Sequence, residues 1–233
     1  MSRASGLHRL QEIDSDSDRL KGRLEEIRIT LEDSSEIAQL KVELQTREAA
    51  TAAIITAARH AENEVDDQRL KLQRTEQSLY GGGVTNPKGL EDLQMEAESL
   101  KRYLGTLEDR YLTVMLEQEE AEIAQEQGTA ALKEAESRQE VLNAELITER
   151  DEVDKRLANL EAEREAALAS VADKDLATYE KLRTQLGGVG VVILEGDSCG
   201  ACGLTLPASS RQLVTSGDEL IRCGQCSRIL YGG

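Results

Sequence analysis

Four cysteines near the C-terminal end have the type and spacing that metal chemistry requires. They form two Cys-x-x-Cys pairs, Cys199–Cys202 and Cys223–Cys226, with 20 residues between the pairs. Each pair can fold the backbone into a knuckle that presents two thiolates, and two knuckles complete a tetrahedral site with Zn–S bonds of about 2.3 Å. Gly203 suits the tight turn after the first pair. Ser227 occupies the corresponding place after the second pair and is conformationally less permissive.

Disulfides or free thiols, and a rubredoxin-like iron site, are the alternatives to zinc. The N-terminal sequence is charged and lacks the apolar segment of an export signal, so we expect a cytoplasmic location. In that reducing compartment, paired Cys-x-x-Cys motifs favour metal over disulfides. Iron sites of the rubredoxin type usually have an aromatic core, which this sequence lacks. We therefore predict one structural Zn²⁺, without an open position for catalysis, held by Cys199, Cys202, Cys223 and Cys226.

The segment that holds the cysteines, residues 187–233, has the composition of short strands and turns. Gly187 and Gly188 end the preceding helical pattern, as glycine commonly does just past a helix. The candidate strands of a zinc ribbon are Val189–Leu194, Leu204–Leu206, Glu219–Arg222 and Arg228–Tyr231. Because about 45 residues cannot bury a sufficient core, the metal is expected to substitute for one.

Residues 1–186 have the heptad spacing and the charged composition of a coiled coil. The pattern is interrupted at residues 80–89, where three consecutive glycines and Pro87 exclude a continuous helix. We interpret this stretch as the turn of an antiparallel helical hairpin. The heptad phase also slips near residues 32–36, where Asp33 and two serines favour a helix cap, so we predict a kink there.

The position of the turn fixes the expected pairing of the two arms. Leu10 of the first arm is expected to lie near Leu160 of the second. A last apolar stripe, from Leu168 to Leu186, has no partner in the first arm and is expected to pack on the C-terminal segment.

The seam of the predicted hairpin is polar in its middle. Gln118 to Gly128 of the second arm face a stretch of the first arm that includes Arg47 and Thr51, so we expect soft packing there. The fold class that follows is mainly α, a long antiparallel coiled-coil hairpin with a small C-terminal β zinc ribbon.

The chain carries a formal net charge of −17 at pH 7, of which residues 187–233 contribute −1. Such a surface repels nucleic-acid phosphate and anionic membranes at long range. No segment approaches the ~20 apolar residues of a membrane span. We therefore expect protein partners and no membrane. Nucleic acid stays an alternative for the ribbon, where a local basic face is offered by Arg211, Arg222 and Arg228.

The most specific sequence features are Leu79-Tyr80-Gly81-Gly82, Thr85-Asn86-Pro87-Lys88, Leu93-Gln94, Glu98-Ser99-Leu100-Lys101-Arg102 and Cys223–Tyr231. Through them, nearly the whole chain resembles a bacterial family of coiled-coil proteins with a C-terminal C4-type zinc ribbon domain. The family's usual loop reads Asn-Pro-Lys-Glu-Leu, and Gly89 replaces the glutamate here. Ser227 stands where the family usually has glycine.

The resemblance implies a helical hairpin that carries a zinc ribbon and has a non-enzymatic role. Some family members resemble adaptors for an alternative sigma factor, or RNA-associated regulators. We expect a monomeric or weakly dimeric adaptor, linked to transcription or other nucleic-acid machinery through protein partners. The alternative is an RNA- or DNA-binding regulator that uses the ribbon. The candidate partner-binding residues of the loop are Tyr80, Gly81, Gly82, Thr85, Asn86, Pro87 and Lys88.

Overall fold

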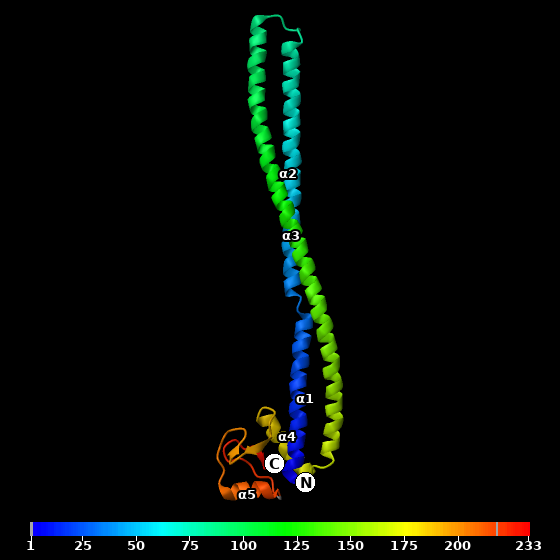
Figure 1. The fold of residues 1–233 in the computed structure, drawn as a ribbon, viewed down its shortest axis with the longest axis vertical. Helices are drawn as coiled ribbons and strands as arrows, with labels where there is room; N and C mark the ends of the chain where they lie inside the picture. Colours follow the sequence, from blue (N-terminus) through cyan, green and yellow to red (C-terminus); the bar gives the residue numbers. More distant parts are fainter. Residues whose placement is uncertain (1, 218) are drawn as a thin grey trace. The chain divides into compact units, whose positions relative to one another are not determined.

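The computed structural model describes residues 2–217 and 219–233. Its long helices are α1 (Arg3–Glu32), α2 (Ser35–Tyr80), α3 (Pro87–Leu168) and α4 (Asp173–Gln185) (Figure 1). The C-terminal segment adds β1 (Val191–Glu195), β2 (Ser198–Cys199), α5 (Ala208–Ser216) and β3 (Ile229–Tyr231). The predicted class, mainly α with a small C-terminal sheet, is confirmed.

The chain forms two compact units, and α3 contributes to both. One unit combines Met1–Asp33 with Leu142–Gly233, and the other is Ser34–Val141. None of the helices in the described residues has an apolar stretch long enough to cross a membrane.

In the unit Ser34–Val141, α2 and the first part of α3 run antiparallel and are joined by the loop after Tyr80 (Figure 1). Gly82 in this loop has a φ of 75°, a conformation that glycine adopts without steric cost. Pro87 is the first helical residue of α3, where its missing N–H has no consequence. The Asn86 side chain accepts a hydrogen bond from the Lys88 N–H at 3.2 Å and so caps the helix.

The polar middle of the seam is filled by side chains that bond to the facing backbone. Arg47 Nη1 donates to the carbonyl oxygen of Ala124 at 2.9 Å, and Thr51 Oγ1 lies 3.3 Å from that of Ala121. Gly128 provides the room for this arrangement, because a Cβ there would lie 3.2 Å from Arg47 Cδ. The expected soft middle is thus closed by hydrogen bonds to helix carbonyls rather than by apolar packing.

In the other unit, α1 packs along the last part of α3. Their buried cluster contains Ile13, Leu20, Val153 and Leu160. The predicted pairing of Leu10 with Leu160 is therefore wrong by three residues. Three residues are nearly one helical turn, so the same face of α1 still meets α3, while Leu10 joins a different cluster.

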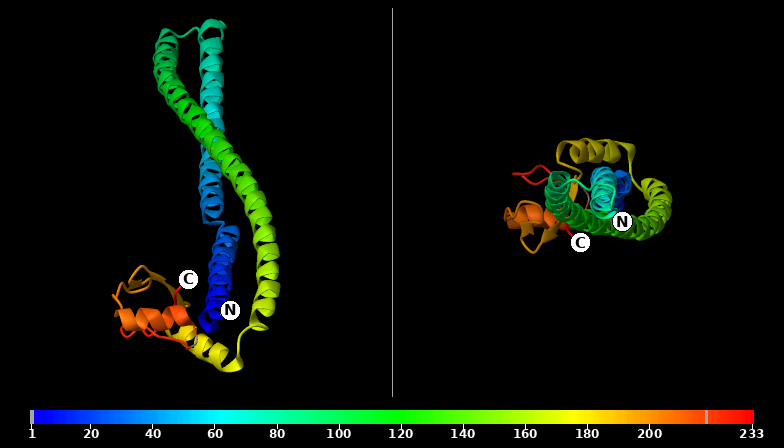
Figure 2. Two further views of the ribbon diagram at one scale, coloured as in Figure 1. Left: turned by 60° about the horizontal axis from the view of Figure 1, so that its bottom comes forward. Right: turned by 90° about the horizontal axis from the view of Figure 1, so that it is seen from above.

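That second cluster lies where α1, α4 and the ribbon meet (Figure 2). It is formed by buried side chains from all three parts, which are Leu7, Leu10, Tyr179, Leu182, Val191 and Ile229. Leu168, Val171 and Leu186 are partly buried against it. The last apolar stripe thus packs on the C-terminal segment as predicted, but the expectation that it has no partner in the first arm is wrong, because Leu7 and Leu10 of α1 belong to the same cluster.

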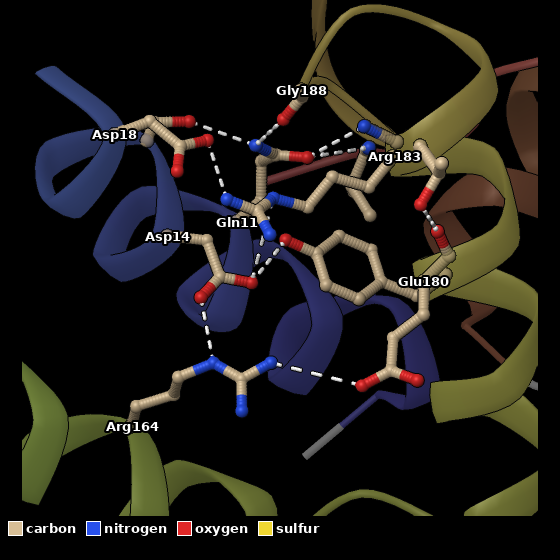
Figure 3. Close-up of polar contacts among 12 residues, drawn as sticks. Gln11, Asp14, Asp18, Arg164, Glu180, Arg183 and Gly188 are labelled. Carbon is tan, nitrogen blue, oxygen red and sulfur yellow. Dashed lines mark hydrogen bonds and ion pairs between the residues drawn. The ribbon is translucent and has the colours of Figure 1, made fainter. Parts of the chain in front are cut away.

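Gln11 of α1 fixes the first residues of the ribbon (Figure 3). Its Nε2 donates to the carbonyl oxygen of Gly188 at 2.8 Å, and its Oε1 accepts the N–H groups of Gly190 at 2.6 Å and Val191 at 3.2 Å. Gly190 also lies so close to α4 that a Cβ there would be 3.1 Å from the Tyr179 carbonyl oxygen. One buried amide therefore satisfies three backbone groups that enter the ribbon.

Asp14 lies about one helical turn after Gln11 in α1 and accepts hydrogen bonds from both α3 and α4 (Figure 3). Its buried carboxylate accepts a hydrogen bond from Arg164 Nε at 2.7 Å and another from the Tyr179 hydroxyl at 2.8 Å. Burial, together with the bond to Asp14, raises the pKa of Tyr179, so the phenol stays a donor at neutral pH. Arg183 of α4 pairs with Asp18 of α1.

The sheet of the ribbon has the order β2-β1-β3, with β1 and β2 antiparallel and β1 and β3 parallel. Two of the predicted strands, Leu204–Leu206 and Glu219–Arg222, are reduced to single bridges at Thr205 and Arg222. The helix α5 was not expected. Its boundaries carry recognisable signals, since Pro207 precedes it and Gly217 follows it with a φ of 72°.

Substitution of Tyr179 by phenylalanine tests the bond between the helices under the ribbon. The change keeps the buried ring but leaves Asp14 without its hydroxyl donor, so we expect a loss of about 1–2 kcal/mol in the free energy of unfolding. Urea denaturation of the full chain measures it. Tyr103→Phe, at an exposed ring, is the matched control and should change nothing; equal stability of the two variants would contradict the role of this bond.

Candidate metal centre and the surfaces around it

The two cysteine pairs form knuckles with the same backbone hydrogen bonds. In the first, the Gly203 N–H donates to the carbonyl oxygen of Cys199 at 2.8 Å, and the Cys199 N–H donates to that of Leu204 at 2.9 Å. In the second, the Ser227 N–H donates to the Cys223 carbonyl oxygen at 3.0 Å, and the Cys223 N–H to that of Arg228 at 2.9 Å. The knuckle turn requires a positive φ, which is 70° at Gly203 and 60° at Ser227.

The four sulfur atoms lie within 4.8 Å of one another. The Sγ atoms of Cys199 and Cys226 are 3.7 Å apart, and those of Cys202 and Cys223 are 3.6 Å apart. These separations match the edge of about 3.8 Å that a tetrahedron has when its centre is ~2.3 Å from each sulfur. They are too long for a disulfide bond, and all four cysteines are free. The quartet is therefore able to bind one zinc ion.

The thiols do not ionise equally when no cation is present. Burial opposes ionisation of Cys223, but the N–H groups of Cys226 and Gln225 outweigh it and lower the pKa of its thiol to about 7. The N–H of Leu204 favours the Cys202 thiolate, yet burial and the neighbouring thiols raise the pKa of Cys202 to about 12. Four adjacent thiolates thus need a cation, and zinc would supply that charge.

The zinc-binding cysteines are part of the ribbon core. Cys199 and Cys223 are buried in a cluster with Leu206, Val214 and Leu230. Four protein ligands leave no position for a substrate or a water molecule, so a zinc ion held here is structural.

The three arginines predicted as nucleic-acid contacts lie in different environments. Arg228 donates from Nε and Nη2 to the carbonyl oxygens of Val189 and Leu186, both at 3.0 Å, and so closes the turn between α4 and β1. Arg211 forms an ion pair with Asp197. Arg222 is exposed, and the structure does not bring the three guanidinium groups into one site.

Arg222 instead lines a cleft together with two lysines from α4. This cleft of about 520 Å³ between α4 and the second knuckle is lined by Lys174, Thr178, Lys181, Arg222 and Ser227, among others. The sequence reasoning missed the two lysines. The sequence does place these lysines on one side of a helix, because the spacing of a single helix face relates Lys174, Thr178 and Lys181.

The residues predicted for partner binding in the loop belong to the unit Ser34–Val141. Thr85, Asn86, Pro87 and Lys88 are exposed, and the Tyr80 ring is 81% exposed. Gly89, which departs from the usual family loop, leaves room for Val84, because a Cβ there would lie 3.1 Å from Val84 Cγ1.

The positive φ of Ser227 predicts a substitution that improves zinc binding. Ser227→Gly removes the strain of a side chain in this conformation. We expect the free energy of zinc binding to become more favourable by about 0.5–1 kcal/mol, which is several-fold tighter binding. Competition with a chelator measures the affinity. The control Ser209→Gly lies in α5 and should not tighten binding, whereas Cys199→Ser should hold less zinc than wild type. If Ser227→Gly binds zinc with the affinity of wild type, the conformation of Ser227 is not strained.

Comparison with known proteins identifies both parts of the chain. Residues 10–187 match the CT398-like coiled coil hairpin domain, and residues 198–230 match the C4-type zinc ribbon domain. An uncharacterized protein of Mycobacterium tuberculosis is 33% identical over 178 residues, which is 72% of this chain and 69% of that protein.

Solved structures share the fold. The structure of CT398 from Chlamydia trachomatis has a TM-score of 0.72 at 19% identity, over 99% of each chain. A Mycobacterium smegmatis structure has a TM-score of 0.68 at 23% identity, over 100% of each chain. With the match over residues 10–187 and the four-cysteine ribbon that follows it, the chain belongs to the family with the CT398-like coiled coil hairpin domain.

Proposed function

We propose that this protein is a non-enzymatic adaptor whose exposed loop and zinc ribbon bind protein partners, in transcription or other nucleic-acid machinery. The observation that carries the proposal is the loop after α2. Its backbone is specified by Gly82 and by the Asn86 cap, while Tyr80 presents an aromatic ring that is 81% exposed. Exposed aromatic residues on an ordered backbone are typical of binding sites.

The chemistry of the remaining polar groups supports an adaptor rather than an enzyme. The four cysteines saturate a zinc ion. The buried carboxylate of Asp14 is already occupied by Arg164 and Tyr179, and its role is to hold three helices together. We propose residues 1–186 and 187–233 as the two functional parts.

The thiol chemistry supports a cytoplasmic location, because a reducing compartment keeps a four-cysteine site free of disulfides. We further propose that the protein is a monomer or a weak homodimer, since the net charge of −17 opposes self-association.

A loop variant tests the proposal directly. Asn86→Ala/Pro87→Ala/Lys88→Ala removes the cap and the exposed cation, and it should lose most of the proteins that the wild-type chain captures from its own cell extract. Capture is quantified by mass spectrometry. Gln127→Ala/Thr129→Ala/Lys133→Ala, three exposed changes in α3, is the matched control. If both variants capture the same proteins as wild type, the loop is not the partner site.

The cleft beside the second knuckle favours RNA or DNA binding by the ribbon as a second candidate function. It gathers three cations, Lys174, Lys181 and Arg222, with two hydroxyl groups, and no carboxylate lines it. Such a lining suits phosphate groups of a nucleic-acid backbone. It contains no aromatic ring on which a base would stack, so any binding there is expected to be independent of sequence.

Salt-dependent binding of single-stranded RNA tests this candidate. Lys174→Gln/Lys181→Gln/Arg222→Gln removes about three phosphate contacts, so the slope of log affinity against log salt should fall by about 2. Fluorescence anisotropy measures it. The control Lys71→Gln/Arg74→Gln/Lys133→Gln removes the same charge from exposed positions elsewhere. Equal slopes for the two variants, or no RNA binding at low salt, would exclude the cleft as a nucleic-acid-binding site.

A further inference from the structure

The middle of α3 has its large apolar side chains on the outside of the helix pair. Leu112, Met115, Leu116 and Ile123 are 58%, 45%, 63% and 48% exposed. From Val114 to Gly128, the half-buried or buried positions of the side facing α2 include Val114, Gln118, Ala121, Gln125 and Gly128. In an isolated helical hairpin, the apolar residues belong in the seam and the polar ones outside. Here several large apolar side chains lie outside, while the seam has two glutamines and only small apolar residues.

The outward position of these side chains is possible because hydrogen bonds to backbone carbonyls help to close the seam at this level. Arg47 and Thr51 of α2 bond the carbonyl oxygens of Ala124 and Ala121. The outer side chains are therefore not needed to hold α2 and α3 together, and within the described residues nothing covers them.

The outer side chains form one stripe along α3. Leu116 follows Leu112 by four residues and Ile123 follows Leu116 by seven, which are the spacings of a single helix face. From Leu112 to Ile123 the stripe is about 17 Å long. These are the dimensions and the anchor spacing with which one amphipathic helix packs on another.

The surroundings of the stripe are strongly acidic. Between Glu108 and Glu126 the chain has seven acidic residues and a single basic one, Arg110. Glu117, Glu119, Glu120 and Glu126 form no ion pair with any residue that the structure describes, and all four are exposed. Glu119 lies on the same helix face between Leu116 and Ile123, so the stripe combines apolar anchors with uncompensated carboxylates on it and beside it.

We propose that this stripe, Leu112 to Ile123 on α3, binds a cationic amphipathic helix of a partner protein. Leucine or isoleucine side chains of that helix cover the stripe, and its lysine or arginine side chains pair with the flanking carboxylates. A second copy of this chain does not fit, because it would bring an equally acidic surface against the first. An anionic membrane is repelled for the same reason. The inference rests on the proposed adaptor function but uses a different surface from the loop.

A synthetic helix provides the probe. It is a peptide of about 18 residues with leucine on one face and lysine elsewhere, labelled for fluorescence anisotropy at about 0.15 M salt. A second peptide with the same leucine face has glutamate in place of lysine. We expect the protein to bind the lysine peptide with one-to-one stoichiometry and not to bind the glutamate peptide.

The decisive variant is Leu116→Gln/Ile123→Gln, which keeps the charge and the helix propensity of α3. We expect it to bind the lysine peptide at least about tenfold more weakly, because two buried anchors are lost. The matched control Val42→Gln/Val141→Gln changes two equally exposed apolar residues outside the stripe and should bind as wild type does. Glu119→Gln/Glu120→Gln should weaken binding and reduce its salt dependence. Circular dichroism verifies that all variants keep their helices.

Several results would overturn the proposal. It fails if Leu116→Gln/Ile123→Gln binds the lysine peptide as tightly as the control Val42→Gln/Val141→Gln does, because binding then does not depend on the stripe. It also fails if sedimentation shows a dimer of wild type that Leu116→Gln/Ile123→Gln abolishes, since a second copy would then cover the stripe.

The loop variant Asn86→Ala/Pro87→Ala/Lys88→Ala should bind the peptide normally. If that loop variant captures proteins as well as wild type does, the adaptor proposal for the loop fails while the stripe is judged by the peptide alone.

Discussion

The amide of Gln11 holds the zinc ribbon against the helices. It bonds the carbonyl oxygen of Gly188 and the N–H groups of Gly190 and Val191, at the point where the chain enters the sheet. A segment as small as the ribbon cannot bury a large core of its own. Its first strand therefore completes a core whose other side chains come from α1 and α4. Zinc holds the knuckles together. Gln11 and the shared core hold the ribbon against α1 and α4.

Bonds from side chains to backbone carbonyls recur in the other unit and have a different consequence. A helix carbonyl oxygen that already accepts its own hydrogen bond has a second lone pair. Arg47, Thr51 and Gln68 use carbonyl oxygens of α3 in this way. These bonds help to close the seam, while Leu112, Leu116 and Ile123 of α3 lie on the outside, where we propose that a partner helix covers them.

The sequence-based description was accurate for features set by neighbouring residues and less accurate for those set by distant ones. The loop was visible from its glycines and Pro87, and the cysteine quartet from its spacing. The helix α5 was missed because its short sequence, between Pro207 and Gly217, was read as a connection between strands. The pairing of Leu10 was wrong because the ribbon core, which the heptad pattern does not describe, takes up that side chain.

By itself, the sequence determined the coiled-coil class, the turn and the four cysteines that can hold zinc, because heptad spacing, glycine conformations and Cys-x-x-Cys turns are local properties of the chain. Only the tertiary structure decided that Gln11 bonds the first residues of the ribbon and that Lys174, Lys181 and Arg222 line one cleft. It also decided that Leu116 and Ile123 face outward. Each of these depends on which helix faces are covered by other parts of the chain, and that choice is made by packing between segments far apart in sequence.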